Sequence, residues 1–473
     1  MFDFTNYITE AKEDGQKLSV IILANSLDEG SAAKVMADVC SFNDISCNLI
    51  DIDKAYLGDA DIELRKVDIR NIDGEGKKLT CNIDSTIVFT RAGAIATQVG
   101  QALISTLQTV GFFMVNDLES MILCDNKMAT TIAMNRSNVK TPRTVILNNE
   151  ESIEYAHNQI GSKFPVIVKT LTGTQGIGVT KVDSMSSLIS VCQSLWKFEA
   201  QLLMQEFLNI DYDIRTLVVD GKILGSTKRI TEKGSEFRSN IHQGANTVPY
   251  ILKDKEIKTI TAAARVSSGY YVGVDHCIID GEIYILEING SPGIGSNYNA
   301  YDLVTQESLG KKSDNKVFDH FLKYILDENN RTKFMRIESG YIETIILEGL
   351  ENDPIRAKLD TGNGTSASML MVDDLKIKDK TVFWKKNGKK FESKLLGISR
   401  AKHMETVDER PIIEHNIIFN NRPYLIHLGL SLKNTASEML CNRDLITLFG
   451  VAINPMKRFA LTPYTARNDK NDL

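Results

Sequence analysis

Short apolar runs alternate with helix-like patterns along the first hundred or so residues. The runs KLSVIILA (17–24), SCNLIDI (46–52) and STIVFTR (85–91) have the length of buried strands. Near them, SAAKVMADVCSF (31–42) and QVGQALISTLQTVGF (98–112) space their apolar residues as one face of a helix does. Strands that alternate with helices predict βαβ units and a parallel sheet, so we expect an α/β fold here.

The pattern changes in the middle of the chain. After a helix-like stretch from Asp117 to Asn135, the run FPVIVKT (164–170) has the character of a buried strand and leads into the Gly-rich TGTQGIGVT (172–180). Further on, Asp220-Gly221 and Asp280-Gly281 each separate two apolar runs, and Asp-Gly in that position is a strong sign of a β-hairpin. We therefore expect an antiparallel sheet that carries helices.

A polar segment, DENNRTK (327–333), gives the clearest domain boundary. It separates the helix-like run FDHFLKYIL (318–326) from the strand-like run YIETIILEGL (341–350), and the chain beyond it is rich in strand-like runs. A length of 473 residues suits about three domains at roughly 150 residues each. We therefore predict four parts: an N-terminal α/β domain (1–116), a second domain (117–326), a linker (327–336) and an all-β domain (337–473).

Composition and charge argue against several classes of protein. Apolar residues make up 42% of the chain and charged residues 25%, which is the balance of a globular protein. No apolar run reaches the roughly 18 residues of a membrane span, and the N-terminus is mixed and acidic, so we expect neither a membrane anchor nor a secretion signal. Seven cysteines without a CxxC pair suggest reduced thiols in the cytoplasm. A net charge of −6 argues against a protein that coats nucleic acid.

Lys169, at the end of a predicted strand, precedes a glycine-rich segment that contains Gly173, Gly176 and Gly178. Glycines allow backbone N–H groups to approach phosphate oxygens, and a lysine at the strand end supplies a positive charge. Taken alone, such a segment is more often a mobile loop than a phosphate site. The segment therefore indicates a phosphate site only in combination with other residues that are suited to binding a nucleotide.

Asp275, Glu287 and Asn289 form the second candidate group. Asp275 and Glu287 are 12 residues apart with the Asp280-Gly281 turn between them, which brings them together across paired strands. Glu287 and Asn289 are two residues apart and point to one face. Two carboxylates and an amide oxygen suit Mg²⁺ better than Zn²⁺. The alternative is that these acids lie on a solvated face, but Glu287 is embedded in the apolar run ILEING, where a carboxylate needs a partner.

Four cationic residues form a third group: Arg215, Lys228, Arg229 and Arg238. Phosphoryl transfer depends on positioning and charge neutralisation, for which such side chains are suited. Each residue alone is more often a surface residue. Combined with a metal site, however, the group favours nucleotide chemistry.

The series VIVKTLTGTQGIGV, LLMQEF, DIRTLVVDGKI, KRITEKGSEFRSNIHQG and VGVDHCIIDGEIYILEINGSPG resembles the ATP-grasp ligases. It is most similar to their RimK type, which adds glutamate to the C-terminal tail of a ribosomal protein. The matching blocks run from about Thr90 to Gly293, and FTRAGA, with Arg91, and NDLESMILCDNKMAT, with Lys127, also fit. The resemblance implies a preATP-grasp domain over 1–116 and an ATP-grasp nucleotide-binding and catalytic domain over 117–326.

The resemblance also implies roles for individual residues. The side chains and loop residues that would bind ATP are Lys127, Lys169, Gly173, Thr174, Gln175, Gly176, Gly178, Gln205, Glu206, Phe207, Asp213 and Arg215. Asp275, Glu287 and Asn289 would coordinate Mg²⁺, for which Mn²⁺ can substitute. Arg238, with Arg229 and Asn240, would stabilise the transferring phosphoryl group and the tetrahedral intermediate.

The activity implied is that of an ADP-forming carboxylate–amine ligase. A carboxylate is a poor electrophile because its leaving group would be an oxide; phosphorylation by ATP gives an acyl phosphate, from which an amine displaces phosphate. We expect the amino acid to be glutamate and the acceptor to be a peptide or protein carboxylate. Two alternatives stay open: a small-molecule ligase of the glutathione-synthetase or lysine-biosynthesis type, and a non-catalytic nucleotide-binding regulatory protein. The second has no use for both Arg238 and Asn289.

The predicted all-β domain contains Asp360-Thr361-Gly362 directly after an apolar strand. This triplet is typical of aspartic proteases, whose chemistry needs two carboxylates, so a single copy demands a homodimer. From about Glu338 to Phe459 the chain resembles the retropepsin-like proteases that accompany RimK-type ligases. The resemblance implies a retropepsin-like β-barrel, dimerisation through it or a tetramer, and cleavage or binding of acidic peptides. The alternative is that Asp360 only caps a turn.

A basic stretch within the same region allows two interpretations. Between Lys376 and Lys402 there are 10 basic and 2 acidic residues. If the ligase builds acidic tails, this surface would attract them. The plainer interpretation, which we favour from the sequence, is a solvated hairpin whose lysines keep an edge strand soluble. Apart from the substrates and further copies of the chain, no nucleic acid or membrane partner is expected.

Overall fold

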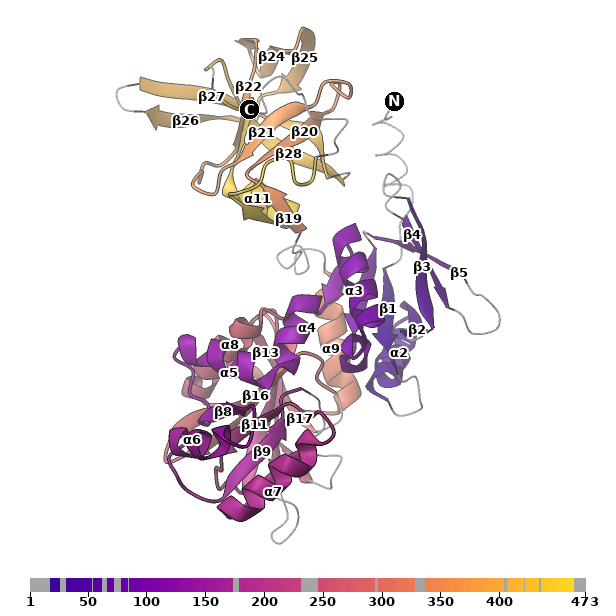
Figure 1. The fold of residues 1–473 in the computed structure, drawn as a ribbon. Coiled ribbons are helices and arrows are strands. Elements are labelled where there is room, and N and C mark those ends of the chain that lie inside the picture. Colours follow the sequence, from indigo (N-terminus) through magenta and orange to yellow (C-terminus); the bar gives the residue numbers. More distant parts are fainter. Residues whose placement is uncertain are drawn as a thin grey trace. The chain divides into compact units, whose positions relative to one another are not determined.

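The computed structural model describes residues 18–25, 31–52, 54–61, 66–71, 78–83, 85–172, 178–230, 246–293, 297–327, 337–403, 406–420, 422–433 and 435–462. They belong to two compact units, each described by itself (Figure 1). The larger unit spans Leu18–Asp59 and Val67–Asp327, and the smaller one includes the described residues from Ile337 onward. The change between the units follows Asp327, the first residue of the predicted linker. None of the described helices is long and apolar enough to cross a membrane.

The larger unit begins with a parallel sheet, as the alternating pattern predicts. Its strands lie in the order β2-β1-β6-β7 and every neighbouring pair is parallel. The strands are β1 (Ser19–Ala24), β2 (Ser46–Asp51), β6 (Thr86–Thr90) and β7 (Phe113–Val115), and the helices are α2 (Ala32–Phe42), the short 3₁₀ helix η1 (Ala92–Ile95) and α3 (Gln98–Val110). Leu23 and Val88 from the strands pack with Ile104 and Leu107 of α3 in a buried core.

Two features of this region were not expected from the sequence. A small sheet of β3 (Ala55–Asp61), β4 (Lys66–Asn71) and β5 (Lys78–Asn82) lies between β2 and β6 in the chain. The stretch from Asp117 to Asn135 is helical, as predicted, but it is divided into α4 (Leu118–Asp125) and α5 (Lys127–Arg136). Asn126 ends the first helix with φ −85° and ψ 96°, and its side chain then accepts a hydrogen bond from the Ala129 N–H at 2.9 Å. It is therefore the N-cap of the second helix.

A central antiparallel sheet follows in the order β10-β9-β11-β8. Its strands are β8 (Thr144–Leu147), β9 (Val166–Thr170), β10 (Val179–Val182) and β11 (Leu202–Glu206), and its helices are α6 (Ser152–Gln159) and α7 (Met185–Trp196). Ile153 of α6 and Leu188 of α7 share one core with Val166 and Val168, so both helices cover the same face of this sheet. Because side chains alternate along a strand, Lys169 belongs to the opposite face.

A second, larger antiparallel sheet has the order β16-β15-β12-β13-β17-β18, with β14 paired to β13. Its strands are β12 (Tyr212–Val219), β13 (Lys222–Ile230), β14 (Asn246–Pro249), β15 (Tyr271–Ile279), β16 (Glu282–Asn289), β17 (Tyr298–Tyr301) and β18 (Ser308–Lys312). Both predicted hairpins are confirmed: Asp220-Gly221 and Asp280-Gly281 join their strands with positive φ at all four residues, as tight hairpin turns require.

Two helices accompany this sheet. Helix α8 (Asp254–Ser267) packs Ile260 and Ala263 against Ile214 and Val274, which leaves the other face of the sheet for polar residues. Helix α9 (Asp314–Leu326) lies between this sheet and the N-terminal one, because Phe321 stacks on Tyr271 of β15 at 4.7 Å and meets Phe89 of β6 edge-on at 5.8 Å. The two sheets are therefore held by one aromatic cluster.

The smaller unit is a closed β-barrel with additions. Six strands follow one another as β20-β21-β29-β22-β28-β27, and pairing of β20 with β27 closes the circle. They are β20 (Ile342–Leu347), β21 (Ile355–Leu359), β22 (Ser368–Met371), β27 (Thr406–Phe419), β28 (Arg422–Ser431) and β29 (Met439–Cys441); β26 (Gly397–His403) pairs with β27. The remaining elements are β19 (Ile337–Gly340), β30 (Val451–Asn454), α11 (Arg443–Phe449) and a sheet of β23 (Asp374–Lys378), β24 (Thr381–Lys386) and β25 (Lys389–Lys394). The predicted all-β character is confirmed, and no disulfide joins any of the seven cysteines.

Candidate active site

Lys169 lies on the face of the central sheet that α6 and α7 leave uncovered. Its ammonium group donates a hydrogen bond to Gln205 Oε1 at 2.7 Å, and Gln205 Nε2 donates to Thr144 Oγ1 at 2.9 Å. Gln205 is itself buried. This chain of three polar side chains, from β9, β11 and β8, fixes the position of the ammonium group on the sheet surface.

Lys127 comes to the same place from α5. It is the first residue of that helix, and its backbone N–H donates to the carbonyl of Leu171, just beyond the end of β9. Burial lowers the pKa of both Lys127 and Lys169, the nearby carboxylate of Glu287 raises both in part, and the charge of Lys127 lowers that of Lys169 further. Two half-buried lysines beside one carboxylate form a site at which an incoming anion would be stabilised.

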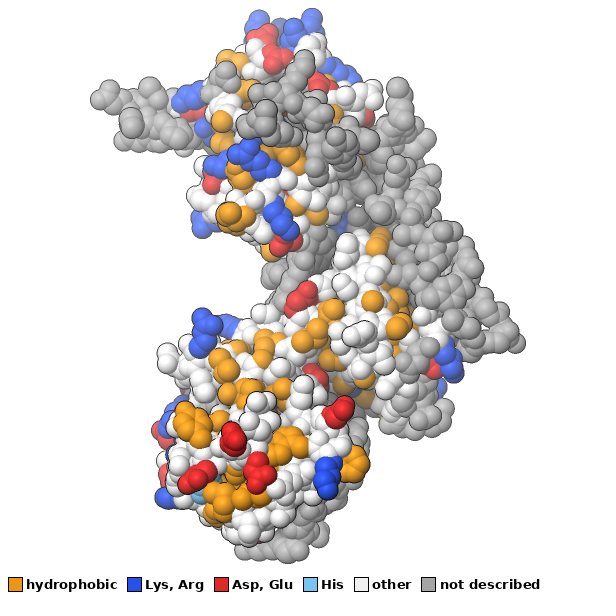
Figure 2. All heavy atoms as spheres, viewed as in Figure 1, with side chains coloured by type: hydrophobic (Ala, Val, Ile, Leu, Met, Phe, Trp, Pro, Cys, Tyr) orange, Lys and Arg blue, Asp and Glu red, His pale blue; other side chains and the backbone are white. Residues whose placement is uncertain are grey.

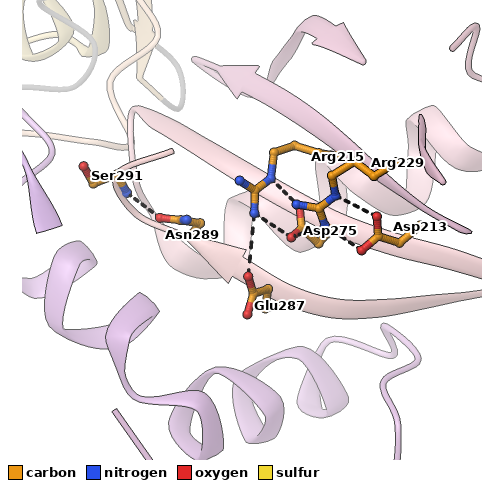
Figure 3. Close-up of polar contacts among 7 residues, drawn as sticks. All are labelled: Asp213, Arg215, Arg229, Asp275, Glu287, Asn289 and Ser291. Atoms are coloured by element: carbon orange, nitrogen blue, oxygen red, sulfur yellow. Dashed lines mark hydrogen bonds and ion pairs between the residues drawn. The ribbon is translucent and has the colours of Figure 1, made fainter. Parts of the chain in front are cut away.

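Asp275 is the centre of a buried ionic network on the polar face of the larger sheet (Figure 3). Arg215 donates Nε to Oδ1 at 2.7 Å and Nη2 to Oδ2 at 2.6 Å, in a bidentate pair. Arg229 donates Nη2 to Oδ2 at 2.7 Å and makes its own bidentate pair with Asp213, at 2.7 and 2.6 Å. Burial alone would raise the pKa of Asp275, but the two arginines outweigh it and hold the pKa below its usual range.

Strand register explains how this network is assembled. Asp213 and Arg229 are direct partners across β12 and β13, and Arg215 and Asp275 are direct partners across β12 and β15. The four side chains therefore alternate in charge across three adjacent strands. Two acids and two arginines balance one another, so the group can remain buried without net charge.

Glu287 and Asn289 lie beside Asp275 on the neighbouring strand. Asp275 and Glu287 are direct partners across β15 and β16, which confirms the pairing predicted from their spacing. The Glu287 side chain is 46% exposed, and its Oε1 lies 3.7 Å from Arg215 Nη2. Asn289 Oδ1 accepts a hydrogen bond from the Ser291 N–H at 3.0 Å. The three predicted metal ligands are therefore brought together on one hairpin.

These residues fit a magnesium–nucleotide pair. Hard oxygen donors suit Mg²⁺, and the two lysines suit phosphate groups. Among the described residues, no group of three or more His, Cys, Asp or Glu side chains could hold a metal by itself. A Mg²⁺ ion here would thus depend on phosphate oxygens and water for further ligands, as this ion commonly does.

Several predicted nucleotide-binding residues have other partners in this structure. Glu206 accepts from the backbone N–H of Arg143 at 2.8 Å and from its guanidinium at 2.8 and 2.5 Å. The Lys181 ammonium lies 4.8 Å from the centre of the Phe207 ring.

Gly178 has φ +76°, and a Cβ there would lie 2.8 Å from Thr170 Cγ2, so the close approach of the loop end to β9 needs glycine.

Part of the predicted site lies outside the described residues. This applies to Gly173, Thr174, Gln175 and Gly176 of the glycine-rich segment, and to Arg238 and Asn240. Their roles stay predictions.

The expected grouping of Lys228 with Arg215 and Arg229 is wrong. Lys228 pairs with Ile214 across the hairpin and so points to the face opposite Arg229. Its ammonium group lies 3.6 Å from the centre of the Tyr212 ring, in a cation–π contact. The alternation of side chains along β13 was sufficient to separate the two neighbours.

Two residues that directly follow strands β6 and β7 of the N-terminal sheet hydrogen-bond the segment after Asn289. Asn116 Nδ2 donates to the carbonyls of Tyr271 and Gly290, each at 2.6 Å, and its Oδ1 accepts from the Tyr271 N–H. Arg91 donates to the carbonyls of Ser291 and Pro292 at 3.1 and 3.2 Å. No role was assigned to either residue from the sequence, because their partners lie at least 155 residues away.

Asp360 lies at the end of β21 in the smaller unit. Its N–H donates to the carbonyl of Cys441 on β29, and its carboxylate accepts from the Gly362 N–H at 3.1 Å. Asp360 is half-buried, while Thr361 and Gly362 are exposed. The turn is therefore anchored to the barrel and presents one carboxylate at its surface.

Comparison with known proteins bears on the larger unit. A family profile described as RimK-like ATP-grasp domain matches residues 124–304. A protein of Vibrio parahaemolyticus named "Probable alpha-L-glutamate ligase" is 30% identical over 248 residues, which cover 52% of this chain and 79% of the relative. A protein of the same name from Saccharophagus degradans is 32% identical over 215 residues, which cover 45% of this chain and 71% of the relative.

Solved structures with some similarity include a D-alanine–D-alanine ligase from Bacillus anthracis complexed with ATP, at 18% identity and a TM-score of 0.44 over 65% of this chain and 95% of that one. Another is a RimK domain protein from Sphaerobacter thermophilus, at 17% identity and a TM-score of 0.42 over 58% and 92%. ATP-grasp enzymes use ATP and Mg²⁺ in forming C–N bonds. On its identity to the two glutamate ligases and on the profile match, the chain belongs to the RimK-like ATP-grasp family of ATP-dependent amino-acid ligases.

Proposed function

We propose that this chain joins glutamate to the carboxylate of a peptide or protein. The observation that carries the proposal is that Lys127, Lys169 and the Asp275–Glu287 pair come together from four elements, α5, β9, β15 and β16. The names of the two relatives support glutamate as the amino acid. The RimK resemblance supports a polypeptide as the acceptor.

The positively and negatively charged residues of the site would bind different parts of the magnesium–nucleotide pair. Lys127 and Lys169 would hold the phosphates of ATP, and Asp275, Glu287 and Asn289 would hold Mg²⁺, which neutralises phosphate charge during transfer. The γ-phosphoryl group passes to an oxygen of the acceptor carboxylate, while its bond to the β-phosphate oxygen breaks and ADP leaves. The glutamate amine then forms a bond to the carbonyl carbon, the C–O bond to phosphate breaks, and the amine loses a proton. Both lysines are half-buried, so their contacts with the phosphates would be stronger than the same contacts in bulk water.

The test uses the full chain with ATP, Mg²⁺, glutamate and a peptide that ends in glutamate. We expect the intact mass of the peptide to rise by whole glutamate residues while ADP is released. The same peptide with an amidated C-terminus should not change. If free amino acids or dipeptides are extended and peptides are not, the chain is a small-molecule ligase; if ATP binds and no ADP appears with any acceptor, the ligase proposal is wrong.

We further propose that the barrel cleaves or binds acidic peptides as a homodimer. It presents a single Asp360 carboxylate, and aspartic-protease chemistry needs two that share a proton, so a second copy must supply the other. The anchoring of Asp360 to β29 and of Asn363 to the Arg443 N–H, at 2.9 Å, supports a preformed loop. A closed six-strand barrel is a rigid platform for such a loop.

Asp360→Asn is expected to abolish cleavage of an oligoglutamate peptide and to leave ligation unchanged, because the loop would lose its ionisable group. Peptide fragments measured by mass spectrometry provide the readout, with cleavage per chain rising with protein concentration if the site is shared. Asp379→Asn is the matched control, since Asp379 occupies an exposed turn with φ 57°, which asparagine tolerates. Cleavage that survives Asp360→Asn would rule out the protease role.

A further inference from the structure

The sheet of β23, β24 and β25 has one apolar and one basic face. Leu375, Val382, Trp384 and Phe391 pack on the barrel core. Because side chains alternate, the strand register places a second set on the other side. We call this side the lysine face; its basic and aromatic members are Lys376, Lys378, Phe383, Lys385, Lys390 and Lys394. At the top of Figure 2, over β24 and β25, blue Lys and Arg side chains gather with a few red acidic ones.

The lysine face contains only some of the basic residues between Lys376 and Lys402. Two of the lysines around the Asn387-Gly388 turn have structural partners on the other side. Lys386 is buried and pairs with Glu438 at 2.7 Å, while Lys389 donates to the carbonyl of Gly349. These two residues fix the sheet to the barrel, so the basic stretch is divided between anchoring and exposed lysines.

Within the described part of the chain, none of the five lysines of the lysine face forms an ion pair. Four of them are exposed and Lys385 is half-buried. The acids on the same face are Asp374 and Glu392, so five positive charges face two negative ones. Phe383, 39% exposed, occupies the middle strand between Lys376 and Glu392. The face therefore combines unpaired positive charge with an apolar centre.

From this pattern we infer that the lysine face docks an acidic, glutamate-rich peptide. In an extended peptide, alternate side chains are about 6.6–6.8 Å apart, and lysines two residues apart on one strand, such as Lys376 and Lys378, have the same spacing. The methylene groups of glutamate can pack on Phe383 while the carboxylates reach the surrounding ammonium groups. The inference rests on the proposed function, since such a peptide is the product of the proposed ligase.

The alternatives to an acidic peptide are a purely protective role for the lysines and a nucleic-acid partner. Lysines that only keep an edge strand soluble need no exposed aromatic ring among them. A single-stranded nucleic acid would also use a ring and positive charges. The acidic peptide is favoured because the proposed ligase would itself produce it, and the nucleic acid becomes one outcome of the test.

The docking surface is separate from the Asp360 loop. The end of the sheet at Asn387-Gly388 is fixed to the turn before β21, because Asn387 Nδ2 donates to Asp353 and Lys389 to Gly349. Asp360 follows the other end of β21. Binding can therefore be measured without removing the carboxylate on which the protease proposal depends.

The experiment measures binding of a fluorescent hexaglutamate peptide to the full chain, without ATP, at low and at physiological salt. We expect binding that weakens as salt rises, because exposed charges are screened. The variant K376Q/K378Q/K390Q/K394Q should weaken binding by at least about tenfold, and Phe383→Ala by about threefold. The matched control, K163Q/K197Q/K258Q/K311Q, removes four exposed lysines of the larger unit and should change affinity by less than about twofold.

Three results would overturn the inference: no binding of hexaglutamate at low salt, equal binding by the lysine-face variant, or binding of an RNA oligonucleotide with none of hexaglutamate. Ligation is assayed on the same samples and should be unchanged in both quadruple variants. If the lysine-face variant loses peptide binding and keeps its ligase activity, the result supports the lysine face as a docking surface that is separate from the ligase site. Absent ligation in the unmodified chain with binding retained counts against the proposed function and leaves the docking surface in place.

Discussion

Asp275→Asn is expected to abolish ATP-dependent ligation and to destabilise the larger unit. The carboxylate is almost fully buried and accepts hydrogen bonds from Arg215 and Arg229 at 2.6–2.7 Å. Its removal leaves one guanidinium without its bidentate partner, and breaking a buried ion pair costs about 3–5 kcal/mol. Urea unfolding should therefore show a lower free energy of unfolding, and ADP release should fall by at least about a hundredfold.

Two further variants separate the metal role from the structural one. Glu287→Gln removes a half-exposed carboxylate, so it should lower ADP release by a similar factor with little change in the free energy of unfolding. Asp280→Asn is the matched control, because Asp280 lies in the turn of the same hairpin with φ 50°, where asparagine is favoured. Full activity of the Glu287→Gln protein would show that this hairpin does not hold the metal.

Lys169→Met is expected to cost activity and to spare stability. Burial already lowers the pKa of Lys169, which means that the protein keeps a desolvated ammonium group at this position. Methionine has a similar length and no charge to desolvate, but it leaves the buried Gln205 Oε1 without its hydrogen-bond donor. The two effects oppose each other, so the free energy of unfolding should change by less than about 2 kcal/mol. ATP affinity and ADP release should fall by about a hundredfold, as expected on losing one fixed positive charge at a phosphate.

The readouts for this variant are calorimetric titration with ATP–Mg²⁺ and urea unfolding of the same protein. Lys163→Met, at an exposed position of the same unit, controls for the loss of a surface charge and should alter neither quantity. Weaker ATP binding together with a large fall in stability would mean that Lys169 is a structural residue. Unchanged ATP binding would remove it from the nucleotide site.

Local sequence patterns predicted much of the fold and the pairing of Asp275 with Glu287 in the candidate site. The Asp220-Gly221 and Asp280-Gly281 turns fixed two hairpins, and the second of these was enough to predict that Asp275 and Glu287 meet across strands. The alternation of strands and helices likewise predicted the parallel sheet. These features depend on residues close together in the chain, where turn geometry and side-chain alternation decide the outcome.

Contacts between distant segments were not predictable in the same way. The ion pair between Arg215 and Asp275 joins residues that are 60 positions apart in the sequence. No local sequence pattern predicts which carboxylate an arginine will pair with. The break at Asn126 was missed because the residues on both sides favour helix, and one side chain that caps the next helix decided it. Lys228, by contrast, was misplaced although the period of two along its strand already contained the answer.

The side chains of Asn116 and Arg91 have a consequence for how the molecule can be divided. Both precede the domain boundary predicted at Asp117, yet they bind the carbonyls of Gly290, Ser291 and Pro292, directly after Asn289. A fragment that began at Asp117 would keep every predicted magnesium ligand and lose the supports of the loop that follows them. The residues that follow β6 and β7 therefore belong to the support of this loop, and the N-terminal region cannot be removed without loss of these hydrogen bonds.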